Sequence, residues 1–63
     1  MNSFVKYIGD NYGEVLNFVT SYVHSDGKNV KLYVIIPFEG DVEVRKGDYI
    51  LKQGNKISIR HDI

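Results

Sequence analysis

Alternating hydrophobic and polar residues predict strands over most of the chain. The clearest pattern covers residues 29–38, where every second residue is apolar and Pro37 marks the end of the strand. The same period of two predicts three more strands, which Gly-containing turns separate: 41–46, 48–53 and 56–63. Residues 3–9 are rich in aromatic and β-branched side chains and predict a strand at the N-terminus.

The period changes to that of a helix between the first two strands. Apolar residues form one helical stripe here: Val15, Leu16, Val19, Tyr22 and Val23. Asn11 and Glu14 have the spacing of a capping box, and Gly27 suits a left-handed position at the end of a helix. The pattern therefore predicts a helix within residues 10–27.

These elements predict one domain, residues 1–63, of the α+β class. The expected order is β-α-β-β-β-β, in two layers, with the helix packed on an antiparallel sheet of four to five strands. Short connections predict that residues 29–60 form an antiparallel meander. The pattern leaves open whether residues 3–8 pair with the strand at 29–38 or with the C-terminal strand.

One helix cannot cover both faces of such a sheet, which points to an interface on the uncovered face. The possible interface residues are Lys31, Tyr33, Ile35 and Ile50. A domain of 63 residues buries only about 60% of the surface of its unfolded chain, so it often needs further stabilisation. Because the chain has no cysteine, a disulfide is excluded, and we expect a homodimer.

The charge balance and the short apolar runs of the sequence argue against two classes of partner, nucleic acid and membranes. The eight basic and eight acidic residues give a formal net charge of zero, which argues against binding nucleic acid through its phosphates alone. The longest apolar run, residues 32–38, is far shorter than a membrane span, and the N-terminus lacks the features of a signal peptide. We expect a soluble protein with no membrane association, and the lack of cysteine fits a reducing compartment.

The sequence contains no recognisable catalytic, cofactor-binding or metal-binding motif. Gly47 and Gly54 lie in turns between strands, without the Gly-Lys-Ser/Thr ending of a phosphate-binding loop. His24 and His61 lack the spacing of metal ligands. Asp48 is expected to accept hydrogen bonds from turn amides. We therefore predict a protein that is not an enzyme and needs no cofactor.

A sheet face that binds single-stranded nucleic acid remains an alternative. Lys31, Tyr33 and Ile35 loosely match the aromatic and basic pattern of such faces. Four basic residues are candidates to flank them: Arg45, Lys52, Lys56 and Arg60. Neither of the two short motifs of the common RNA-recognition fold is present.

Two segments of the chain stand out: "GDN" to "EVLNF" at 9–18, and "EGDVEVRKGDYILK" at 39–52. Both resemble a group of small phage and prophage proteins of Gram-positive bacteria. The matching residues are Gly9, Asp10, Asn11, Glu14, Val15, Phe18, Gly40, Asp41, Val44, Gly47, Asp48, Tyr49 and Ile50. The chain departs from that group at its end, where "IRHDI" replaces a "C-K-P-D-x-F" tail.

The resemblance implies a phage accessory protein, located in the host cytoplasm, that binds and blocks a host protein. In its most specific form, the expectation is that the blocked host protein belongs to an anti-phage defence system. An inhibitor of Hachiman-type defence is one specific candidate. A structural component of a phage particle is the other alternative. The resemblance implies no active site, so no catalytic residue is carried over.

Overall fold

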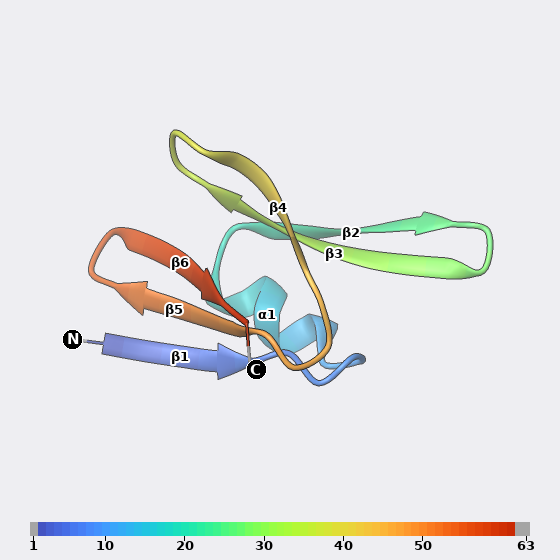
Figure 1. Ribbon diagram of the computed structural model, residues 1–63, viewed down its shortest axis with the longest axis horizontal. Helices are drawn as coiled ribbons and strands as arrows, with labels where there is room; N and C mark the ends of the chain where they lie inside the picture. The colour runs from blue at the N-terminus through green and yellow to red at the C-terminus, as the bar shows by residue number, and fades with distance from the viewer. Residues whose placement is uncertain (1, 62–63) are drawn as a thin grey trace.

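The computed structural model describes residues 2–61, which form two three-stranded antiparallel sheets and one short helix around a common core (Figure 1). In chain order the elements are β1 (Asn2–Lys6), α1 (Tyr12–Phe18), β2 (Ser21–Asp26), β3 (Asn29–Ile36), β4 (Gly40–Val44), β5 (Tyr49–Gln53) and β6 (Lys56–Arg60). The fold is therefore mostly β, with one helix.

The strands do not form the single sheet of four to five strands that the sequence predicts. One sheet has the order β2-β3-β4 and the other has the order β1-β5-β6. The expected meander over residues 29–60 is wrong because β4 pairs with β3 alone, whereas β5 pairs with β6 and β1. The N-terminal strand takes neither of the two partners considered for it, since it lies antiparallel to β5.

The turn between β4 and β5 moves the chain from one sheet to the other. Asp48 Oδ2 accepts a hydrogen bond from the Arg45 amide at 3.0 Å, and the Asp48 amide donates to the Arg45 carbonyl at 2.9 Å. Gly47 has a φ of 98°, which favours glycine. Tyr7 then fixes the turn to β1, because its amide donates to the Asp48 carbonyl and its carbonyl accepts from the Gly47 amide. The predicted role of Asp48 is confirmed.

The helix is shorter than its periodicity predicts. It ends at Phe18, and Val19 is already extended, with φ −140° and ψ 163°. The following residues, Ser21–Asp26, form β2 instead of a further turn and a half of helix. The segment combines β-branched and aromatic residues, which fit a strand better than a helix. Gly27, with a φ of 65°, belongs to the two-residue turn between β2 and β3 and not to a helix end.

Asn11 begins the helix in a different way from a capping box. Its side chain makes no capping hydrogen bond to the helix. Instead, Asn11 Oδ1 accepts from the Ile8 amide at 2.8 Å, and Nδ2 donates to the Lys6 carbonyl and to Glu14 Oε1. Asn11 therefore holds together the loop that joins β1 to α1.

The core lies between the two sheets. The helix and all the described strands except β2 contribute side chains to it. Its buried members are Tyr7, Val15, Val19, Leu32, Val34, Ile36, Val44 and Ile50. On β3 these are the alternate residues Leu32, Val34 and Ile36, as the sequence pattern indicates. Their neighbours on β3 consequently point to the opposite, outer side of the β2-β3-β4 sheet.

Candidate binding surface

The outer side of the β2-β3-β4 sheet carries a continuous group of aromatic, apolar and charged side chains. Residues that lie opposite each other in an antiparallel pair share a face. The register aligns Tyr22 with Tyr33 and Glu43, His24 with Lys31, and Ile35 with Asp41. We call this surface the tyrosine face, and it consists of Tyr22, His24, Lys31, Tyr33, Ile35, Asp41 and Glu43.

Two stacked tyrosines form the centre of the tyrosine face. The rings of Tyr22 and Tyr33 are 5.3 Å apart between centroids, and their planes differ by 19°. Tyr22 Oη donates a hydrogen bond to Asp41 Oδ2 at 2.6 Å. This hydrogen bond raises the pKa of Tyr22, because the carboxylate accepts only from the protonated phenol. The stacking and the hydrogen bond thus fix the position of the Tyr22 ring on this surface.

Charges of both signs surround these rings. His24 and Lys31 lie toward the β2-β3 hairpin, and Asp41 and Glu43 lie on β4. Glu43 Oε2 is also 3.9 Å from Arg45 Nε. The face is amphipathic and locally close to neutral, which is typical of protein-binding surfaces and unlike the basic grooves that bind nucleic acid.

Three of the four predicted interface residues lie together on this face. Lys31 is exposed, Tyr33 is half-buried and Ile35 is 39% exposed. Ile50 lies elsewhere, because it is fully buried in the core on β5. The prediction for Ile50 assumed one continuous sheet. In the two-sheet fold the side of β5 that carries Ile50 faces inward.

Sequence reasoning missed Tyr22 and Asp41, which complete the face. The sequence pattern places Tyr22 in the helical stripe, and Asp41 is named there only among the residues that match the phage proteins. A signal for Tyr22 existed in the β-branched and aromatic residues between Val19 and Val23, which favour a strand over a helix. The contact with Asp41 follows only from the three-strand register.

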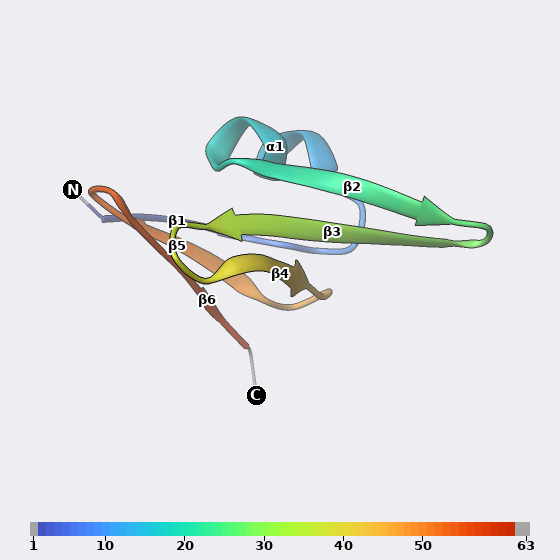
Figure 2. The same ribbon diagram turned by 90° about the horizontal axis from the view of Figure 1, so that it is seen from above.

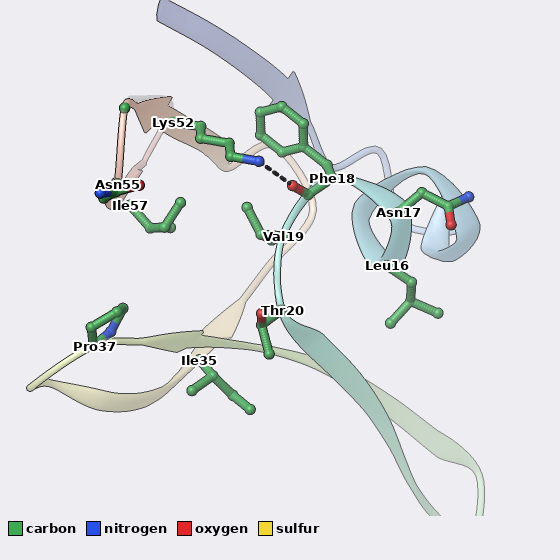
Figure 3. Close-up of a pocket in the computed structure, with 11 residues that line it drawn as sticks. Leu16, Asn17, Phe18, Val19, Thr20, Ile35, Pro37, Lys52, Asn55 and Ile57 are labelled. Carbon is green, nitrogen blue, oxygen red and sulfur yellow. Dashed lines mark hydrogen bonds between the residues drawn. The ribbon is translucent and has the colours of Figure 1, made fainter.

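A groove of about 470 Å³ borders the tyrosine face at Ile35. It runs between the end of α1, the end of β3 and the β5-β6 hairpin (Figure 3). The Lys52 ammonium crosses it, donating to the Phe18 carbonyl at 3.2 Å and lying 5.5 Å from the centroid of the Phe18 ring. Lys52 therefore joins the hairpin to the helix end, which is a structural role.

Phe38 is the most exposed large hydrophobic residue among those that the structure describes. It lies in the turn between β3 and β4 and has a φ of 70°. A left-handed conformation is unfavourable for phenylalanine. The turn thus exposes the Phe38 side chain to solvent and holds its backbone in a conformation that is unfavourable for phenylalanine.

One histidine–aspartate pair resembles part of a catalytic arrangement. His61 Nδ1 is 2.9 Å from Asp48 Oδ1, and the Asp48 side chain is buried. The same carboxylate caps the β4-β5 turn through the Arg45 amide. Among the hydrogen bonds of residues 2–61, none joins His61 to a hydroxyl group that would serve as a nucleophile. The pair therefore fixes the C-terminal end of β6 to the turn, a contact that the sequence did not predict.

The described residues contain no group of three potential metal ligands. Among residues 2–61, no helix combines the length and the apolar character needed to cross a membrane. Comparison with protein-family models, with curated proteins and with solved structures finds no match for the chain. The geometry of the tyrosine face is consequently the strongest basis for a function.

Proposed function

We propose that this protein acts without catalysis, by covering a surface of another protein with its tyrosine face. The observation that supports this proposal most directly is the stack of Tyr22 on Tyr33, held by Asp41 on an exposed sheet. Tyrosines are enriched among the residues that contribute most to protein–protein binding. Because the stack exists in the free protein, binding loses little side-chain entropy in ordering it.

The partner that we propose is a host protein of a Gram-positive bacterium. The resemblance to small phage proteins supports this choice, and a component of an anti-phage defence system is the sharpest candidate, with Hachiman-type defence as one example. A blocker of this kind needs only a complementary surface. The mixture of Lys31, Asp41 and Glu43 around the tyrosines favours a partner whose own surface carries both charges.

Single-stranded nucleic acid is the rival occupant of this surface. Aromatic rings are available for stacking, but the carboxylates of Asp41 and Glu43 lie on the same face as Lys31. Phosphate groups approaching the rings would meet both carboxylates. The charges therefore favour a protein partner over a nucleic acid.

An affinity capture with matched variants tests the proposal. The tagged protein is expressed in a Gram-positive host, the lysate is treated with nuclease, and the retained proteins are identified. The variant Tyr33→Ala removes one half of the stack. The control Phe4→Ala changes an aromatic residue that is 64% exposed on β1, in the other sheet.

We expect one host protein to be retained in near-stoichiometric amount by the wild type and by Phe4→Ala, and lost with Tyr33→Ala. Equal retention by both variants would contradict the role of the tyrosine face. Capture that disappears after nuclease treatment would support nucleic acid, and recovery of the protein in purified phage particles would support a structural role.

A further inference from the structure

The β2 strand has an open edge whose hydrogen-bonding groups follow a symmetric pattern. β2 lies at the side of its sheet, next to β3 alone. The Ile35 amide donates to the Thr20 carbonyl at 2.9 Å, so the even-numbered residues along this segment bond to β3. The amides and carbonyls of Ser21, Val23 and Ser25 therefore point away from β3. These three positions are symmetric about Val23.

The β2 edge also lacks the features that usually prevent strands from pairing. Exposed edges are commonly protected by lysine, proline or charged side chains. Among the other edge strands, β6 carries Lys56 and Arg60, and β4 carries Asp41 and Glu43. β2 carries no lysine or proline, and its one carboxylate, Asp26, is at its end.

We propose that a second copy of this chain pairs antiparallel with the β2 edge, on a two-fold axis at Val23. Val23 then lies opposite Val23 of the second copy, and Ser21 lies opposite its Ser25. On the outer side Tyr22 lies beside His24 of the other copy, and Asp26 lies opposite its Thr20. No like charges meet in this register, and the formal net charge of zero leaves no overall repulsion between the copies.

The shape of the hairpin supports the same arrangement. The β2-β3 hairpin extends well beyond the rest of the molecule, and α1 lies beside only the first part of β2 (Figure 2). The inner side of the hairpin consequently leaves Val23 37% and Val30 46% exposed, and Leu16 on α1 is 44% exposed. Antiparallel pairing places each hairpin end alongside the α1 of the other copy, where these apolar side chains are covered.

The pairing joins two sheets into one of six strands, with the order β4-β3-β2-β2-β3-β4. Because the outer sides become continuous, the two tyrosine faces form one surface with two-fold symmetry. The inference thus extends the proposed function, which concerns the partner of that surface. It also explains how a chain of 63 residues without cysteine gains stability.

Single cysteine variants test the register directly, since the chain has no cysteine of its own. Residues opposite each other at a hydrogen-bonded position are about 5.5 Å apart between Cα atoms, within the range of a disulfide. Val23→Cys should therefore form a reducible covalent dimer on mild oxidation. Val30→Cys is the control, because it is similarly exposed but lies one strand further from the axis, at least about 14 Å from its counterpart.

We expect the covalent dimer to form at least tenfold faster with Val23→Cys than with Val30→Cys at micromolar concentration. Equal rates for the two variants would overturn the proposed register. Circular dichroism of both reduced variants checks that each is folded as the wild type is.

Sedimentation of the unmodified protein provides an independent test. The wild type should sediment as a dimer and Val23→Pro as a folded monomer, because the proline removes an amide that points away from β3. A wild-type monomer at micromolar concentration would overturn the inference. That result would not contradict the proposed function, because the capture experiment with Tyr33→Ala tests the tyrosine face and not the β2 edge.

Discussion

Tyr22 Oη donates to Asp41 Oδ2 across the central strand β3, joining the two edge strands of the sheet on its outer side. The interaction depends on a register in which β2 and β4 flank β3 in the same plane. It also orients the Tyr22 ring against Tyr33. This hydrogen bond therefore links the register of the sheet to the surface that we propose to bind a partner.

Removing the acceptor should lower the pKa of Tyr22. Asp41→Ala deletes the carboxylate that favours the protonated phenol, so the pKa should return toward the usual value of 10.0. Ultraviolet titration of the tyrosines, or NMR of the ring carbons, measures this change. Glu43→Ala is the control on the same strand, and a shift of equal size with that variant would contradict the specific contact.

Truncating Ile50 should cost far more stability than truncating Ile35. Ile50 has no exposed surface, whereas Ile35 is 39% exposed. Replacing a buried isoleucine with alanine costs about 2–5 kcal/mol, a large fraction of the stability of a domain this small. Ile35→Ala should cost less than about 1 kcal/mol. Denaturant unfolding compares the two variants, and similar losses would contradict the inward placement of Ile50.

Alkaline pH should destabilise the fold through Tyr7. Burial raises the pKa of Tyr7 to about 12 from the usual 10.0. The folded state therefore binds a proton that the unfolded state releases first. The stability linked to Tyr7 is complete below pH 10.0 and is lost as the pH rises toward about 12.

Chemical unfolding across this pH range checks the linkage. Tyr7→Phe should lose stability less steeply with pH than the wild type does, because its ring cannot ionise. Tyr49→Phe, on β5, serves as the control. Equal slopes for Tyr7→Phe and the wild type would show that Tyr7 does not contribute.

Replacing Phe38 with glycine should stabilise the protein. Phe38 has a φ of 70° and its side chain is fully exposed, so glycine relieves the unfavourable conformation without removing a core contact. The gain should be up to about 1 kcal/mol, since glycine also makes the unfolded chain more flexible. Phe4→Gly, within β1, should be destabilising. Thermal unfolding of both variants gives the comparison, and a loss with Phe38→Gly would contradict the account of the turn.

The local pattern predicted five of the six strands in residues 2–61, missed β2, and did not predict how the strands pair. The alternation of Leu32, Val34 and Ile36 correctly indicates which side of β3 is buried. No comparable pattern shows that β5 pairs with β1 and not with β4, because β5 carries apolar residues on both of its sides, Tyr49 and Leu51 on one and Ile50 on the other. The decisive contacts are backbone hydrogen bonds between Tyr7, Gly47 and Asp48, which involve residues far apart in sequence.

The residues after Phe18 show why helix and strand were confused. Val15, Val19 and Val23 are spaced by four, and that spacing fits both a helical stripe and a short helix followed by a strand. Val15 and Val19 are buried, as the stripe predicts, but Val23 is partly exposed on the hairpin. Lys31, Tyr33 and Ile35 nevertheless share the outer side of β3, because the alternation along a strand does not depend on its neighbours.

The proposed surface and the proposed dimer both require Ser21–Asp26 to be a strand paired with β3. NMR tests this requirement directly. At non-hydrogen-bonded positions of an antiparallel pair the Cα atoms are about 4.5 Å apart, so their hydrogens should give strong cross-strand contacts. We predict these contacts between Val23 and Leu32 and between Ser21 and Val34. Contacts between residues three apart within 19–24, as in a continuing helix, would contradict the account.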